Sequence, residues 1–149
     1  MRMLRVRSLL LCASCLVLSG CDEKLSSIAG PTPNLEPTFA SIQRDIFQTT
    51  DAAGRTACTV CHTNVGRNPS AGMNLLPEFA YAQLINVPGR RVGSLRVIPG
   101  DPDNSYLVQK LEGSAGIVGN RMPNNGPPYL TDGQIRIIKR WIEIGAPNN

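Results

Sequence analysis

Hydrophobic residues recur at helical spacing near both ends of the segment 37–149. Pro37 or Thr38 can begin a first helix, because proline is tolerated in the first turn and threonine caps helix N-termini. The apolar stripe of that helix is formed by Phe39, Ile42, Ile46 and Phe47. A last helix follows the capping-box pattern at 131–134 and runs to Ile144,. Its inward-facing residues are Ile135, Ile138, Trp141 and Ile142,.

Two further helices are predicted between these ends. Residues 75–87 carry apolar positions at helical spacing, with a proline tolerated only in the first turn,. Residues 106–112 form a shorter apolar stretch that ends at a glycine, and 95–98 is apolar enough for a short extended piece,. The glycine-rich stretches 63–72 and 114–130 predict loops, and a loop as long as the second is usually functional. The predicted fold class is therefore all-α.

The first 20 residues have the composition of an export signal. Three arginines precede a short apolar run, 8–18, which is too short to span a bilayer,. Val17-Leu18-Ser19-Gly20-Cys21 resembles a bacterial lipoprotein box, in which the cysteine is lipidated and becomes the new N-terminus. Ordinary secretory cleavage, with Cys21 merely nearby, is the alternative. We expect a periplasmic protein held by lipid on Cys21 to the inner or the outer membrane of a bacterium.

Serine, proline, glycine and asparagine dominate residues 22–36, which contain few large apolar side chains. This composition is typical of a flexible tether, and about 15 such residues have an r.m.s. reach on the order of 20 Å. The chain is therefore predicted to contain an export signal at 1–20, a lipidated N-terminus and tether at 21–36, and one domain at 37–149.

The net charge says little about function once the export signal is set aside. The formal net charge of the full chain is +4, but three of the fifteen Lys and Arg lie in the first 20 residues. Twelve basic residues then remain against eleven acidic ones. A nearly neutral mature protein offers no argument for nucleic-acid binding, so we expect no nucleic-acid partner.

Candidate chemistry is concentrated at Cys58-Thr59-Val60-Cys61-His62, where two cysteines meet the only histidine of the chain. The spacing C-x-x-C-H is typical of covalent attachment of a c-type haem. Both thiols can add to haem vinyl groups from one helical turn, and His62 then follows as the proximal iron ligand through Nε2. We expect Nδ1 of His62 to donate to a backbone carbonyl, which fixes the tautomer of the ring.

Two other interpretations of the motif are weaker. A thioredoxin-like redox pair needs a βαβ context, and the flanking residues lack a run of β-branched side chains,. A zinc half-site needs further Cys or His ligands, and the mature chain has none to offer,. Cys12 and Cys15 lie in the export signal and Cys21 takes lipid, so no cysteine remains for a disulfide,.

A second axial ligand must come from another residue type, because His62 is the only histidine. The methionines outside the export signal are Met73 and Met122. Met73 lies eleven residues after His62, on the proximal side, and would have to cross the porphyrin edge. Met122 lies in the long loop 114–130, which can close over the opposite face. We favour Met122 as the distal ligand, with Met73 or an open site as the alternatives, and we expect a hollow bordered by Cys58, Cys61, His62 and Met122.

Several short motifs accompany C-x-x-C-H along the domain. They are Gly-Met-Asn-Leu at 72–75, Pro-Gly-Asp-Pro at 99–102 followed by Ser-Tyr-Leu at 105–107, Arg-Met-Pro at 121–123, and Leu-Thr-Asp at 130–132 running to Trp-Ile at 141–142 and Gly-Ala-Pro at 145–147. Together they resemble the bacterial monohaem cytochrome c domains often called planctomycete-type. The resemblance implies an all-α cytochrome c fold with the N- and C-terminal helices crossed beside the haem, periplasmic electron transfer, and Met122 as the distal ligand. Met73 is a departure, because such domains often carry leucine there.

Iron held by a histidine and a methionine has no free site for a substrate. We therefore expect a one-electron relay between redox partner proteins, such as a periplasmic oxidoreductase and a respiratory complex, through a small transient interface. A haem enzyme or gas sensor with an open distal site is a second possible class, and a non-haem thiol-disulfide lipoprotein is a third. Arg121 is a candidate partner for a haem propionate, the alternative being an arginine in contact with solvent.

Overall fold

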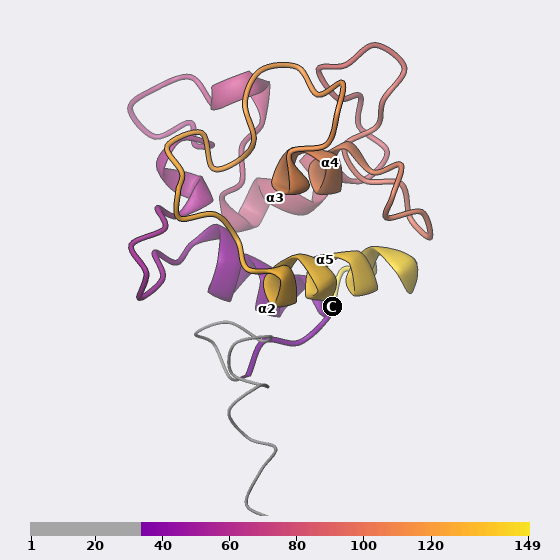
Figure 1. The fold of residues 1–149 in the computed structure, drawn as a ribbon, viewed down its shortest axis with the longest axis horizontal. Helices are drawn as coiled ribbons and strands as arrows, with labels where there is room; N and C mark the ends of the chain where they lie inside the picture. Colours follow the sequence, from indigo (N-terminus) through magenta and orange to yellow (C-terminus); the bar gives the residue numbers. More distant parts are fainter. Residues whose placement is uncertain (1–33) are drawn as a thin grey trace, which may run out of the picture.

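The computed structural model describes residues 34–149. Within this range, short helices and helical turns are joined by long loops and no β-strand is formed (Figure 1). None of the described helices is long and apolar enough to cross a bilayer. The predicted export signal, Cys21 and the tether up to residue 33 lie outside the described residues. The all-α prediction is thus confirmed for the part of the chain that the structure describes.

The predicted first helix is present but changes its winding half-way. Helix α2 spans Phe39–Ile42, and the hydroxyl of Thr38 caps it by accepting from the backbone N–H of Ser41 at 3.2 Å. The chain continues as a wider π turn, η1, over Gln43–Phe47. There the N–H of Gln48 donates to the carbonyl five residues earlier at 3.1 Å. All four predicted apolar residues of this segment are buried.

Helix α3 spans Pro77–Leu84 and is shorter than the predicted 75–87. It ends early because a segment distant in sequence takes over its hydrogen bonding. The N–H of Val97 donates to the carbonyl of Leu84 at 3.1 Å, and isolated bridges pair 85–88 with 95–97. The expected extended piece at 95–98 is therefore present in part, and it removes the last predicted turn of α3.

Helices α4 and α5 agree closely with the sequence pattern. Helix α4 spans Tyr106–Glu112 and ends at Gly113, whose φ of +74° lies in the left-handed region that favours glycine,. Helix α5 spans Asp132–Glu143. Its capping box is complete, because Thr131 and Gln134 each accept from the other's backbone N–H, at 3.2 and 3.0 Å,.

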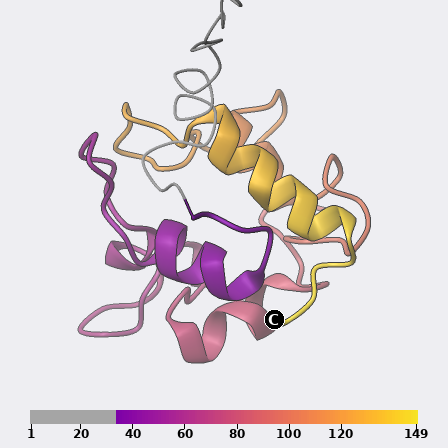
Figure 2. The same ribbon diagram turned by 90° about the horizontal axis from the view of Figure 1, so that it is seen from below.

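Helices α2 and α5 lie side by side on one face of the domain (Figure 2). The ring of Phe39 joins three helices, with its centroid 5.5 Å from Trp141 of α5 and 5.1 Å from Tyr81 of α3. Trp141 is fully buried, and its Nε1 donates to the carbonyl of Pro147 at 2.9 Å. These contacts make the first and last elements of the domain part of one core.

The core contact of α5 can be tested with two isoleucines of the same segment. Ile138 is fully buried and Ile144 is 47% exposed. We expect Ile138→Ala to lower the free energy of unfolding by about 2–5 kcal/mol, because it leaves a cavity. Ile144→Ala should change it by less than about 0.5 kcal/mol. Urea unfolding followed by circular dichroism measures both, and equal losses would contradict the packing described.

Candidate functional site

The C-x-x-C-H motif forms a tight turn against η1. The 3-10 turn η2 spans Cys58–Val60, and the carbonyl of Cys58 accepts from the N–H of Cys61 at 3.2 Å and of His62 at 2.9 Å. Both cysteines are free thiols. Cys58 packs against the core with its Sγ 3.8 Å from the carbonyl of Ile46, whereas Cys61 is exposed. The turn therefore holds one thiol at the core and the other at the surface.

His62 is oriented by two backbone carbonyls. Its Nδ1 lies 3.0 Å from the oxygen of Ser70 and 3.2 Å from that of Met73. Because carbonyl oxygens only accept, Nδ1 carries the proton and the lone pair is on Nε2. The contact expected from the sequence is present. Burial lowers the pKa of His62 from its ordinary value, so the ring is neutral at pH 7,.

The loop 63–72 closes on this histidine through its backbone. The N–H of Ser70 donates to the backbone carbonyl of Cys61 at 3.0 Å, and the N–H of Leu75 donates to the backbone carbonyl of His62 at 2.8 Å. Ala71 and Gly72 adopt left-handed backbone angles, with φ of +57° and +62°. This turn brings the chain back so that the carbonyls on either side of it reach the same ring nitrogen. The backbone carbonyl of Met73 is consequently held beside Nδ1.

Met122 lies on the second long loop and packs against the core, half-buried. Its N–H donates to the carbonyl of Lys110 at 2.8 Å. The Lys110 ammonium donates in turn to the carbonyls of Val118, at 2.9 Å, and Asn120. Further along this loop, the amide of Asn125 donates to the hydroxyl of Thr56 at 2.8 Å. The loop therefore extends from the end of α4 to the residues just before Cys58.

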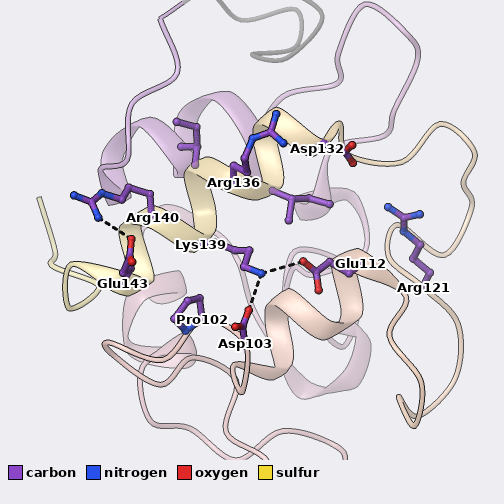
Figure 3. A pocket seen from close by; sticks show the side chains of 11 residues that line it. Pro102, Asp103, Glu112, Arg121, Asp132, Arg136, Lys139, Arg140 and Glu143 are labelled. Carbon is purple, nitrogen blue, oxygen red and sulfur yellow. Dashed lines mark hydrogen bonds and ion pairs between the residues drawn. The ribbon is translucent and has the colours of Figure 1, made fainter.

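Arg121 has partners within the protein. Its Nε donates to the carbonyl of Leu111 at 2.7 Å, and its guanidinium lies 4.2 Å from the centre of the Tyr129 ring. It lines a cavity of about 830 Å³ between α4 and α5. Figure 3 shows the ion pairs at that cavity, where Lys139 bridges Asp103 and Glu112. No residue of C-x-x-C-H lines it, so the propionate role expected for Arg121 stays a prediction.

Neither this cavity nor a second one is lined by Cys58, Cys61, His62 or Met122, the residues of the expected hollow. The second one, of about 400 Å³, lies between α2 and the C-terminal residues. Cys58, Met73 and Met122 instead pack directly against the hydrophobic core. The structure therefore places each of these side chains against the core, and a hollow bordered by them stays a prediction.

Arg55 is a buried residue that the sequence analysis did not single out. Its side chain is fully buried and pairs with Asp51, whose Oδ2 lies 3.1 Å from Nε. The remaining donors reach the carbonyls of Ile46, Thr49 and Thr56 at 3.3–3.4 Å. The available signal was the i,i+4 spacing of Asp51 and Arg55 just before the motif, which is common in solvent-exposed pairs as well. Arg55 ties the end of η1 to the turn that precedes Cys58.

The electrostatic environment of the Cys58 thiol has two opposing parts. Burial raises its pKa above the ordinary value, because a thiolate loses its hydration there,. The positive charge of Arg55 acts in the opposite direction. The net direction is upward, so Cys58 stays a protonated thiol at neutral pH in the folded chain.

Metal ligation by side chains alone finds little support. Among residues 34–149, no three His, Cys, Asp or Glu side chains are grouped so that they can hold a metal ion. The zinc half-site interpretation therefore lacks its remaining ligands in the described structure. A covalently attached porphyrin would need only two thiols and one or two axial ligands.

Comparisons with known protein families, curated proteins and solved structures give no match to this chain.

The buried ion pair can be tested by removing its cation. Arg55→Met should lower the free energy of unfolding by about 3–5 kcal/mol, because it leaves the Asp51 carboxylate buried without a partner. Arg44→Met is the matched control, since Arg44 pairs with Asp45 at 2.7 Å on the solvent-exposed side of the same segment. The control should be nearly as stable as the native protein. Chemical unfolding compares the two, and a similar stability for both variants would show that Arg55 is not structurally required.

Proposed function

We propose that this protein is a periplasmic, membrane-anchored monohaem c-type cytochrome that carries single electrons and is not itself an enzyme. The observation that supports this most directly is the C-x-x-C-H turn, with both thiols free and the histidine held in the tautomer that ligates iron. Lipidation at Cys21 would supply the anchor, through a tether of about 15 residues. The helical fold, with α2 and α5 in contact, is compatible with a cytochrome c-like arrangement.

The chemistry of the donor set fits a covalently held haem. Cys58 and Cys61 would each form one thioether bond, and their different exposure suits a group with one buried and one accessible edge. His62 would be the proximal ligand, because the lone pair on Nε2 is free while Nδ1 is used by the protein. When bound, the haem iron supplies a couple that gains or loses one electron.

Met122 is the better candidate for the distal ligand. The backbone of Met73 is held at Nδ1, the nitrogen of His62 that does not ligate iron. Met122 belongs to a separate loop that is fixed to the end of α4 and reaches back to Thr56. Like Cys58, Met122 packs against the hydrophobic core. Ligation from both sides would leave no position for a substrate, which supports a relay over catalysis.

Haem attachment and lipidation can be tested together on the full-length protein from cells competent in cytochrome c maturation. We expect a haem-stained band, and an intact mass equal to the chain from Cys21 plus one haem and the acyl groups. Cys58→Ala/Cys61→Ala should lose the stain and keep the lipid mass. Cys21→Ala is the matched cysteine control and should keep the stain but lose the lipid mass. Colourless native protein with two titratable thiols would favour a thiol-disulfide lipoprotein instead.

The choice of distal ligand gives a spectroscopic prediction. Oxidised native protein should show the far-red absorption that arises from methionine sulfur bound to ferric iron, and the reduced form should bind carbon monoxide slowly. Met122→Leu should abolish this absorption and speed carbon monoxide binding, because a leucine cannot ligate. Met73→Leu should leave both unchanged. Rapid carbon monoxide binding by the native protein would contradict the relay and favour a haem enzyme or gas sensor.

A further inference from the structure

Gln83, near the end of α3, binds the peptide group whose carbonyl holds His62. The carbonyl of Met73 is one of the two acceptors at Nδ1, at 3.2 Å. The other end of that peptide group is the N–H of Asn74, which donates to Oε1 of Gln83 at 2.7 Å. Because a backbone N–H only donates, the Gln83 atom that faces it is the amide oxygen. A chain of hydrogen bonds therefore runs from His62 through one peptide group to Gln83.

The peptide group couples the two hydrogen bonds at its ends. It is planar, so an acceptor that fixes the N–H also fixes the direction of the carbonyl. Hydrogen bonds in such chains polarise one another and strengthen by about 10–30% per bond. A stronger acceptor at Nδ1 draws the imidazole proton further away from the ring, and the lone pair on Nε2 becomes more basic. Gln83 can therefore act on Nε2 without touching it.

Gln83 and its peptide partner are both held in place. The backbone carbonyl of Gln83 accepts from Nη1 of Arg96 at 2.8 Å, and Nη2 of the same guanidinium lies 3.4 Å from the carbonyl of Gly72. Gln43 of η1, which is buried, donates through Nε2 to the carbonyl of Leu75 at 2.8 Å. Side chains from three separate parts of the domain thus fix the short stretch that contains the peptide group.

We propose that Gln83 is a positioning residue for His62, which acts through the Met73–Asn74 peptide group and sets the strength with which Nε2 binds haem iron. This inference rests on the proposed electron-carrier function, since it concerns the proximal ligand of that haem. A more basic ligand favours the ferric over the ferrous state. Gln83 therefore holds the reduction potential below the value that the same peptide group would give without an acceptor.

A purely structural role for Gln83 is the alternative. Asn74 is only 3% exposed, and a buried N–H without an acceptor is costly,. That role requires some acceptor at residue 83, whereas the effect on His62 depends on how strong the acceptor is. Substitutions that grade the strength of the acceptor therefore separate the two roles.

The test compares acceptors at residue 83 in full-length proteins that carry Cys21→Ser, which prevents lipidation. Gln83→Leu removes the acceptor, and Gln83→Glu supplies a stronger, charged one. His62 is the only histidine, so its Hδ1 proton gives a single imidazole N–H resonance, which moves downfield as the hydrogen bond strengthens. We expect this resonance to move upfield in Gln83→Leu and downfield in Gln83→Glu. The equilibrium reduction potential should rise in Gln83→Leu and fall in Gln83→Glu.

Gln48→Leu and Gln48→Glu are the matched controls. Gln48 is exposed at the end of η1, and within residues 34–149 it forms no hydrogen bond with residues 70–75. Both controls should keep the Hδ1 resonance of the native protein. Gln83→Glu retains an acceptor for the buried N–H, so it tests the proposal even where Gln83→Leu fails to fold.

An Hδ1 resonance that moves in the same direction in both Gln83 variants, or no more than in the Gln48 controls, would overturn the role of Gln83. The resonance needs no haem, so this proposal and the electron carrier fail separately. Colourless protein whose resonance follows residue 83 would remove the electron carrier and keep the coupling of Gln83 to His62. Haem-bearing protein whose resonance and potential ignore residue 83 would remove only the role of Gln83.

Discussion

The arrangement at the candidate site depends on the contact of His62 Nδ1 with two backbone carbonyls. This contact determines both the tautomer and the orientation of the ring, and so the direction in which Nε2 is available. It exists only because the chain reverses at Ala71 and Gly72, which adopt left-handed backbone angles. Such a conformation costs little for glycine, whereas for alanine it is unfavourable by about 1–2 kcal/mol. The strain at Ala71 is offset by the backbone hydrogen bonds that close the loop on both sides of His62.

The buried pair of Arg55 and Asp51 constrains the motif from the other side. A guanidinium with no exposure must have its donors satisfied, and here the carbonyls at the end of η1 and in the following turn provide acceptors,. Backbone carbonyls from the segment 46–56 thereby surround the guanidinium of Arg55. Because Cys58 follows directly and is in contact with Ile46, the position of its thiol depends on that arrangement. A buried salt bridge of this kind is weak evidence for stability in itself, but the loss of either partner leaves the other charge buried and unpaired.

Features coded by neighbouring residues could be predicted from the sequence. The capping box at Thr131, the glycine that ends α4 and the carbonyl contact of His62 involve partners within a few residues or one loop. Features that depend on distant partners could not be predicted. Helix α3 loses its last predicted turn to Val97, and the π turn η1 has no local signature in its apolar stripe. The burial of Arg55 was missed for the same reason, since Asp51 and Arg55 look like an exposed pair until the surrounding carbonyls are placed.

The end of α4 shows how a local signal can determine the position of a distant side chain. The last carbonyls of a helix have no partner within it, and Gly113 fixes where those carbonyls occur,. The carbonyl of Lys110 accepts from the N–H of Met122, and that of Leu111 accepts from Nε of Arg121. A helix one turn longer would use these acceptors internally and leave the loop without its attachment. The place of Met122 in the domain therefore follows from a glycine nine residues earlier, although Met122 itself carries no signal for a helix end.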